Sequence, residues 1–359
     1  MKIFPIIKCV GVSCNLRCSY CYHSESDQSV NAHTVMPLDV VERLISQTIE
    51  VNNGFCHCLW HGGEPLLAGL NFFNHVVIIQ KKFIARGARI TNSIQTNGTL
   101  ITTKWAEFFR DNHFRVGISI DGPTQIHNRY RKDTRNRGSF NSVMRGIKTC
   151  QQNDCDVGII AAVTSYSAQF PKEMYSFFIS NGIKKISFNP VYEVDSLGRL
   201  YPYSVDDRSF GDFLSAIFNM WIEEDDPDAV IRQFTDPLTK MCGGSVSTCI
   251  FAGSCSKFLE IYGDGAIKPC HGFKTQVLGN ITEQTIREMF TGDPYQKLLH
   301  ATQKLPTNCV SCEWLSVCNG GCCDHRNTEF SSVGSDSYVF CNSRKRIFSL
   351  LKEFVADHQ

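Results

Sequence analysis

Short apolar segments alternate with amphipathic ones over the first 192 residues. Segments rich in β-branched and aromatic residues predict six strands: Ile3–Val10, Phe55–Trp60, Arg89–Gln95, Arg115–Ile120, Val157–Thr164 and Lys185–Val191. Segments with helical spacing lie between them: Pro37–Glu50, Leu70–Ala85, Lys104–Asn112, Ser139–Gln152 and Pro171–Asn181. This alternation predicts an α/β fold of right-handed βαβ units, as an open barrel or a doubly wound sheet. In both arrangements ligands bind at the carboxyl ends of the strands.

The pattern changes after residue 192. Tyr192–Tyr203 is typical of an irregular linker, and Asp207–Glu224 has the spacing of a helix. Cysteine and glycine then dominate Cys242–Cys341, before a last helical segment at Ser343–Ala356. We therefore expect a small, metal-supported module to follow the α/β region.

Composition narrows the class of protein. The 359 residues carry a net charge of +1, so no broad electrostatic field favours nucleic acid or an anionic membrane. We find no signal peptide and no apolar run long enough to span a bilayer. The 18 cysteines are unusual, because disulfide-rich scaffolds are normally short secreted chains. Clustered cysteines in a chain of this kind indicate metal binding, and we expect a cytoplasmic protein.

The first chemical motif follows the first predicted strand. Cys14, Cys18 and Cys21 have the spacing C-x3-C-x2-C, which lets three thiolates surround one metal centre. A four-iron cluster needs four ligands, so three cysteines leave one iron open for an external ligand. The alternatives are a zinc site completed by His23, or three unconnected core cysteines.

Polar motifs end the next predicted strands. Gly62-Gly63-Glu64 lets backbone approach a ligand, and the Glu64 carboxylate is an acceptor for an ammonium group. Further polar residues at or after strand ends are Gln95, Ser119, Asp121, Arg131 and Asn189. Such residues converge on one mouth of a βα fold, although Asn-Gly and Asp-Gly pairs are also ordinary turn sequences.

The cysteine triad, with aromatic Tyr20 before its last member, resembles the signature of the radical S-adenosylmethionine (SAM) superfamily. The resemblance implies that SAM chelates the open iron and is cleaved to a 5′-deoxyadenosyl radical, which removes hydrogen from a substrate. It also implies that the Gly62–Glu64 turn binds the SAM amino group, and that Ser119 and Arg131 contact the ribose and carboxylate. The SAM-contacting residues expected from the motifs and the resemblance are Tyr20, Gly62, Gly63, Glu64, Gln95, Ser119, Asp121, Arg131 and Asn189.

Eight cysteines of the last part of the chain resemble the SPASM extension of radical SAM enzymes. By that resemblance a first auxiliary cluster is held by Cys249, Cys255, Cys270 and Cys322. A second is held by Cys309, Cys312, Cys318 and Cys341. Two zinc sites would have the same ligand count. Cys323 competes with Cys322, which we favour because it keeps the Cys-x-Gly-Gly-Cys spacing.

The resemblance implies a partial (β/α)6 TIM-like radical SAM barrel followed by a cysteine-rich SPASM domain. We expect the barrel over residues 1–200, a linker helix region over 201–241, the SPASM domain over 242–345 and a C-terminal helix over 346–359. The expected cofactors are SAM and three [4Fe-4S] clusters. A flavodoxin or ferredoxin is the expected reductant.

The shared stretches Gly62–Phe73, Gln95–Leu100 and Gly117–Arg131 most resemble anaerobic sulfatase-maturating enzymes, which oxidise a cysteine or serine of a sulfatase to formylglycine. Those enzymes carry an aspartate, proposed as a base, directly after the cysteine of a Pro-Cys motif. This chain has His271 there, and an imidazole can also accept a proton near neutral pH. Because of that departure, we rank a related activity first: cross-linking of a ribosomally made peptide, through a C–C cyclophane or a thioether.

The peptide maturases often carry an N-terminal peptide-recognition domain. Only thirteen residues precede Cys14, so we expect the barrel mouth, the Tyr192–Tyr203 segment or a separate protein to recognise the precursor peptide or protein substrate. Two further classes stay open: a non-catalytic iron–sulfur electron-transfer protein, and a radical SAM enzyme that builds a small-molecule cofactor. The SAM-site motifs disfavour the first, and the cysteine-rich extension disfavours the second.

Overall fold

The computed structural model describes residues 2–23, 35–270, 277–326 and 338–357. It divides into two compact units. The first contains Met1–Ser119, Asn128–Val157 and Ser256–His300, and the second contains Ile120–His127, Gly158–Cys255 and Ala301–Gln359. Three helices have residues in both units: α4 (Thr124–Tyr130), η3 (Cys255–Lys257) and α11 (Asp293–Gln303).

A sheet forms the centre of the first unit. Its strands lie in the order β10-β9-β8-β1-β2-β3-β4, with the bounds β1 Phe4–Lys8, β2 Phe55–Trp60, β3 Arg89–Thr96, β4 Phe114–Ser119, β8 Phe258–Tyr262, β9 Ala266–Pro269 and β10 Gly279–Asn280. The pairs from β8 through β4 are parallel, whereas β8–β9 and β9–β10 are antiparallel. The carboxyl ends of β1 to β4 therefore meet at one edge, where the polar motifs follow.

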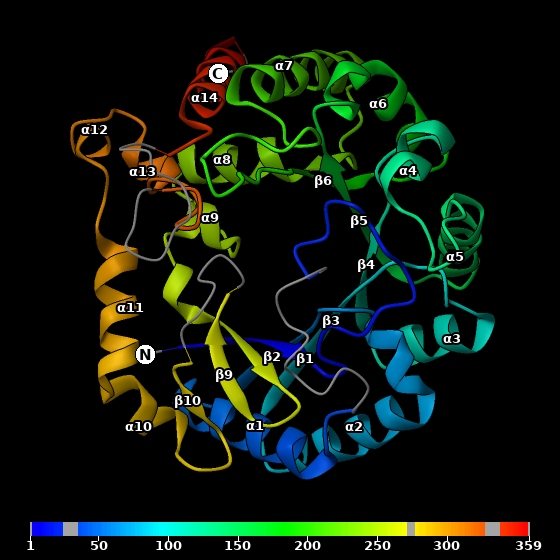
Figure 1. The fold of residues 1–359 in the computed structure, drawn as a ribbon, viewed down its shortest axis with the longest axis vertical. Coiled ribbons are helices and arrows are strands. Elements are labelled where there is room, and N and C mark those ends of the chain that lie inside the picture. Colours follow the sequence, from blue (N-terminus) through cyan, green and yellow to red (C-terminus); the bar gives the residue numbers. More distant parts are fainter. Residues whose placement is uncertain (1, 24–34, 271–276, 327–337, 358–359) are drawn as a thin grey trace. The chain divides into compact units, whose positions relative to one another are not determined.

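Helices cover one face of this sheet (Figure 1). They are α1 Leu38–Val51, η1 Pro65–Ala68, α2 Gly69–Ile84, α3 Thr103–Asp111, α5 Phe140–Gln152 and α10 Ile286–Thr291. Their apolar sides form an aromatic cluster in which the Phe73 ring contacts Trp60, Trp105 and Phe114 edge-on. Phe73 and Trp60 are fully buried. Burial of each of these large side chains stabilises the folded state by roughly 2–3 kcal/mol.

The second unit contains the parallel strands β5 Asp156–Val163, β6 Lys185–Pro190 and β7 Val230–Ile231, in the order β5-β6-β7. The first two residues of β5 belong to the first unit. Its helices are η2 Ser167–Gln169, α6 Pro171–Ser180, α7 Asp207–Glu224, α8 Arg232–Met241, α9 Cys249–Ala252, α12 Thr307–Val310, α13 Leu315–Cys318 and α14 Cys341–Asp357. The α14 helix lies beside α7 (Figure 1), where the Asp207 carboxylate accepts hydrogen bonds from the Asn342 and Ser343 N–H groups.

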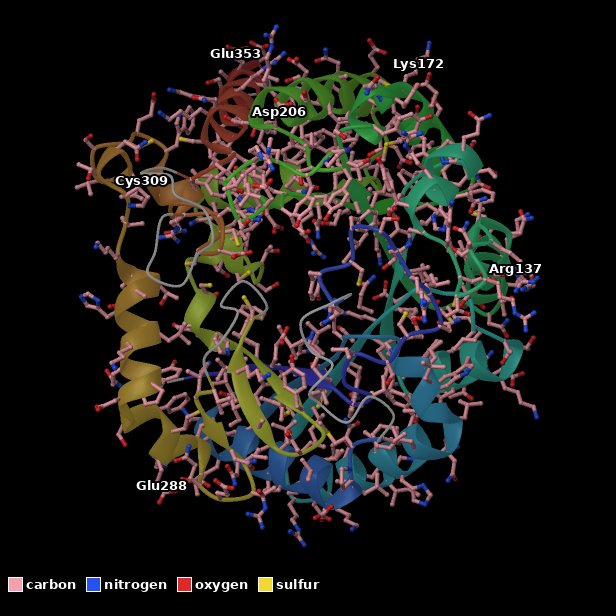
Figure 2. All side chains as sticks on the ribbon, viewed as in Figure 1. Arg137, Lys172, Asp206, Glu288, Cys309 and Glu353 are labelled. Carbon is pink, nitrogen blue, oxygen red and sulfur yellow. The ribbon has the colours of Figure 1, made fainter. Side chains whose placement is uncertain are left out.

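The six predicted strands and the helices between them are confirmed, with ends that differ by at most two residues. The hydrophobic pattern did not predict α4, the short β7 and α8, or strands β8 to β10. In β8 the apolar run is interrupted by Glu260, which is buried because Lys8 pairs with it. Among the described helices, none is long and apolar enough to cross a membrane. Charged side chains such as Lys172, Arg137 and Glu288 lie on the outside (Figure 2).

Candidate functional site

The cysteine triad lies in the loop that follows β1. The pKa of the Cys14 thiol is raised to about 11, mainly by burial; Glu64, Cys18 and Cys21 contribute to the rise, and a hydrogen bond from the Leu16 N–H opposes it. Because Cys18 and Cys21 lie close enough to disfavour ionisation of Cys14, a cation is needed to stabilise the Cys14 thiolate beside them. Their surroundings therefore suit a bound metal centre, as the sequence spacing predicts.

The Gly62–Gly63 turn is held against this loop. Both glycines have positive φ, and a side chain at Gly62 would overlap Lys8, while one at Gly63 would overlap the Ser13 carbonyl. The Glu64 N–H also donates to the Ser13 oxygen, at 2.8 Å. Since Ser13 directly precedes Cys14, the turn is fixed beside the first cysteine, and only glycine permits so close an approach.

The Glu64 carboxylate is fully buried and connects this turn to the end of β3. Oε1 accepts from Thr96 Oγ1 at 2.7 Å and from the Leu66 N–H at 3.0 Å, and Oε2 accepts from the Asn97 N–H at 2.7 Å. Burial raises the pKa of Glu64, although these bonds and the Arg131 charge oppose the shift. Three of the roughly four acceptor positions of the carboxylate are therefore used within the chain, and Glu64 positions the turn.

Asn97 is a site residue that the sequence analysis did not single out. Its Nδ2 group donates to Asn15 Oδ1 at 2.8 Å and lies 3.7 Å from Cys14 Sγ. The side chain thus connects the end of β3 to the cysteine loop. The signal was present in the sequence, because Asn97 stands in the polar motif that ends the third predicted strand.

Four more of the predicted SAM contacts lie in the same unit. Gln95 on β3 donates to Ser119 Oγ on β4, at 3.0 Å. Arg131 is buried and its guanidinium donates to the Tyr20 hydroxyl at 3.0 Å. Tyr20, Glu64 and Arg131 are thereby connected through hydrogen bonding and charge, and the hydroxyl and guanidinium groups are donors for a carboxylate or a ribose.

The remaining predicted residues lie elsewhere in the chain. Asp121 and Asn189 belong to the second unit. The Asp121 carboxylate accepts from the Ala162 N–H at 3.2 Å, and the Asn189 amide oxygen accepts from Ser187 Oγ at 3.0 Å. His271 lies outside the described residues, so its predicted role as a base stays a prediction.

A buried ion pair lies beside the glycine turn and was not predicted. Lys8 Nζ lies 2.9 Å from Glu260 Oε1, and the two side chains are 0% and 5% exposed. The Tyr262 hydroxyl donates to Glu260 Oε2 at 2.9 Å. Burial raises the pKa of Tyr22 well above its ordinary value, with further contributions from Glu260 and the thiols of Cys21 and Cys270. Tyr22 is thus electrostatically close to a cysteine of the triad and to one of the first auxiliary set.

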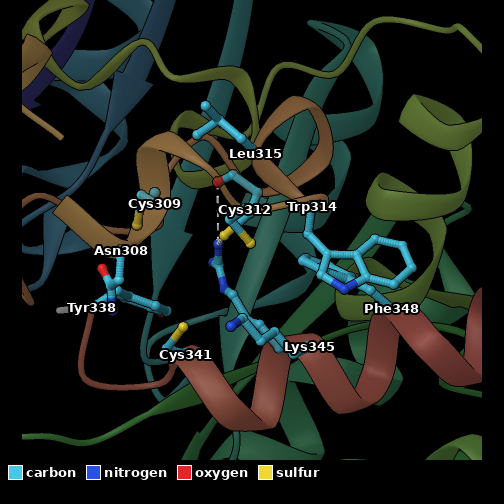
Figure 3. Close-up of a pocket in the computed structure, with 12 residues that line it drawn as sticks. Asn308, Cys309, Cys312, Trp314, Leu315, Tyr338, Cys341, Lys345 and Phe348 are labelled. Atoms are coloured by element: carbon cyan, nitrogen blue, oxygen red, sulfur yellow. Dashed lines mark hydrogen bonds between the residues drawn. The ribbon is translucent and has the colours of Figure 1, made fainter. Parts of the chain in front are cut away.

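The second auxiliary set lies within the second unit and lines one pocket. Cys309, Cys312, Cys318 and Cys341 all contribute to its wall, together with apolar Trp314 and Phe348 (Figure 3). Burial raises the pKa of Cys309 and of Cys341, and neighbouring thiols of the set contribute to both shifts, whereas Arg326 opposes the first and Lys345 the second. Four thiols that line one pocket suit a cluster with four cysteine ligands.

The first auxiliary set is divided between the two units, since Cys270 belongs to the first and Cys249, Cys255 and Cys322 belong to the second. The neighbouring Cys323 is 1% exposed and accepts a hydrogen bond from Arg326 at 3.1 Å. A hydrogen bond with Cys255 lowers the pKa of Cys323, although burial opposes this. The choice of Cys322 over Cys323 therefore stays a prediction. Among the described residues, no three His, Cys, Asp or Glu side chains form a site for a single metal ion.

Comparison with known proteins shows the family. The radical SAM superfamily model matches residues 9–175, and the SPASM iron–sulfur cluster-binding domain model matches residues 241–313. The cysteine-type anaerobic sulfatase-maturating enzyme of Clostridium perfringens is 33% identical over 353 residues, which are 96% of this chain and 94% of that protein. The serine-type enzyme of Bacteroides thetaiotaomicron is 35% identical over 346 residues, 90% of this chain and 83% of that protein.

A solved structure shows the same similarity. Native anSMEcpe with bound AdoMet and Cp18Cys peptide superimposes with a TM-score of 0.88 at 30% identity, and the match covers 100% of both chains. The predicted radical SAM fold with a SPASM domain is therefore confirmed, as is the prediction of a radical SAM enzyme that acts on a peptide. The similarities favour the sulfatase-maturase alternative over the peptide cross-linking that we ranked first. This chain belongs to the radical SAM enzymes with a SPASM domain, in the family of the anaerobic sulfatase-maturating enzymes.

Proposed function

We propose that this protein is an anaerobic sulfatase-maturating enzyme, which oxidises a cysteine or serine of a sulfatase to formylglycine. The observation that carries the proposal is similarity of 30% identity or more, over nine-tenths or more of this chain, to enzymes of both the cysteine and the serine type. The complex of a similar protein with a peptide supports a peptide substrate. His271 then takes the position of the proposed base.

The eleven predicted cysteines are proposed to hold three [4Fe-4S] clusters. Cys14, Cys18 and Cys21 would hold the first cluster, which with SAM would supply the 5′-deoxyadenosyl radical for abstraction of one hydrogen atom from the substrate side chain. The residues of the first unit prepare this site. Asn97 and the Glu64 carboxylate hold the end of β3 against the cysteine loop, and Gly62 and Gly63 present backbone to the ligand.

The oxidation removes two electrons and two protons from the substrate side chain. One electron and one proton leave as the hydrogen atom, so one of each remains to be taken up by the protein. For serine this yields the aldehyde directly; for cysteine, water replaces the sulfur, which leaves as hydrogen sulfide. We propose that His271 accepts this proton and that an auxiliary cluster, held by the SPASM cysteines, would take the remaining electron. A cytoplasmic flavodoxin or ferredoxin is proposed as the reductant that starts each turnover.

The test compares three synthetic peptides with the reduced, cluster-loaded enzyme and SAM. One contains Cys-x-Pro-x-Arg, the second has serine at the reacting position, and the third has alanine there. We expect 5′-deoxyadenosine and an aldehyde, captured by a hydrazide probe and located by mass spectrometry, with the first or second peptide only. A product that has lost two hydrogen atoms without a reactive aldehyde would instead support the cross-linking alternative.

A further inference from the structure

Arg344 on α14 is a buried cation beside the second auxiliary set of cysteines. Its side chain lines the same pocket as Cys309, Cys312, Cys318 and Cys341. The residue is 8% exposed. Its Nη1 group donates to Cys318 Sγ at 3.4 Å and lies 3.5 Å from the carbonyl oxygens of Cys318 and Ile250.

Two aromatic rings fix the orientation of the guanidinium. Its central carbon lies 4.6 Å from the centroid of the Phe251 ring and 4.7 Å from that of Tyr338. Aromatic faces attract a cation, most strongly where water is excluded. The planar group is therefore held in place with one edge directed at a cysteine sulfur.

This cation has no carboxylate partner in the described part of the chain. The salt bridges there do not include Arg344, and the acceptors that its guanidinium reaches are Cys318 Sγ and the carbonyl oxygens of Cys318 and Ile250. The Asp207 carboxylate accepts hydrogen bonds from the backbone N–H groups of Asn342 and Ser343 at the start of α14. A buried charge is costly unless an opposite charge compensates it. The cysteine sulfurs are the anionic groups available to this guanidinium.

We propose that Arg344 is the counter-ion of the second auxiliary cluster and raises its reduction potential. The inference rests on the proposed cluster assignment. A four-iron cluster with four thiolate ligands carries a net negative charge that grows on reduction, so a fixed neighbouring cation stabilises the reduced form more. Hydrogen bonds to the sulfurs and exclusion of solvent act on the same potential. Arg344 supplies both a charge and a hydrogen bond, at Cys318 Sγ.

The chain offers a matched control on the same helix. Arg346 lies two residues further on, where its side chain is 52% exposed and pairs with Asp212 at the surface. Solvent screens that charge strongly. Arg346→Gln therefore removes the same charge from the same helix without removing a buried counter-ion.

The experiment is a reductive titration followed by electron paramagnetic resonance. The full-length, cluster-loaded protein carries alanine at the three cysteines of the radical SAM motif, so that only auxiliary clusters contribute signals. Arg344→Gln, Arg344→Lys and Arg346→Gln are compared with this background, and iron and sulfide content are measured for each. We expect Arg344→Gln to retain iron and to shift the reduction equilibrium of one cluster at least tenfold toward the oxidised form, which is about 59 mV for a one-electron couple. Arg344→Lys, which keeps a charge without the planar donor, should show a smaller shift in the same direction, and Arg346→Gln none.

Each other outcome decides the question. An iron-replete Arg344→Gln protein with unchanged potentials would overturn the role of Arg344 and leave the cluster assignment intact. If Arg344→Gln loses iron, the Arg344→Lys protein is measured instead. A reduction potential lower than that of the background protein supports the inference, and a potential equal to it overturns the inference. If the background itself holds iron for fewer than two clusters, the cluster assignment fails together with the inference.

Discussion

The buried pair of Lys8 and Glu260 gives the sharpest stability prediction. It joins β1 to β8, the strand that brings the C-terminal part of the chain into the first sheet. Replacing Lys8 with methionine keeps most of the side-chain volume and removes the ammonium group. The Glu260 carboxylate then stays buried with the Tyr262 hydroxyl as its donor.

The size of the effect follows from the geometry. Two unit charges separated by 2.9 Å attract by about 6 kcal/mol at an effective dielectric constant of about 20. The cost of removing both charges from water offsets much of this, so the intact pair stabilises the fold little. Removing one partner leaves that cost uncompensated, and we expect Lys8→Met to destabilise the fold by about 3–5 kcal/mol. The double variant Lys8→Met with Glu260→Met should lose less than the single variant.

Unfolding of a protein with bound clusters is not two-state, so the assay compares midpoints of anaerobic thermal unfolding at one scan rate. At about 2.1 cal/mol/K per residue, the 359 residues have an unfolding entropy of roughly 0.75 kcal/mol/K, so Lys8→Met should lower the midpoint by about 4–7 °C. The control is Arg287→Met, which breaks a pair with Glu50 whose side chains are 67% and 62% exposed. We expect that change to cost about 0–1 kcal/mol. A Lys8→Met midpoint equal to that of the control, or a double variant below the single one, would refute the reasoning.

Three further predictions concern the site. Cys18→Ala should abolish 5′-deoxyadenosine formation from SAM and lower the iron content by one cluster, while leaving the auxiliary signals; product formation at the original rate would contradict the triad assignment. Glu64→Gln should weaken SAM binding at least tenfold, because an amide cannot accept from all three donors and the Asn97 N–H loses a charge-assisted bond worth roughly 1.5–3 kcal/mol. Isothermal titration of the cluster-loaded protein with SAM measures the affinity. An unchanged affinity would exclude a positioning role for Glu64. Cys322→Ser should lose auxiliary-cluster iron whereas Cys323→Ser should retain it, and the reverse pattern would exchange the two assignments.

The first half of the fold was predictable from periodicity. Continuous or alternating apolar residues predict strands that are buried on one or both faces, such as Phe55–Trp60. An apolar stripe at helical spacing predicts the helices between them. The β8 strand was not predictable in this way. Its Glu260 breaks the apolar run, and its burial depends on Lys8, which is 252 positions earlier in the sequence. The hydrophobic pattern of a short segment does not show which distant residue will pair with it.

The sequence by itself determined the chemistry of this protein, because cysteine spacing and glycine-rich turns are local features that a metal cluster and its ligand require. Only the tertiary structure showed how these features are held. It placed Asn97 against Cys14, used the Glu64 carboxylate to bind the end of β3, and buried Arg344 beside Cys318. These contacts join segments far apart in the chain, and their energies depend on burial and dielectric environment. Both are properties of the packed molecule, which no local run of residues records.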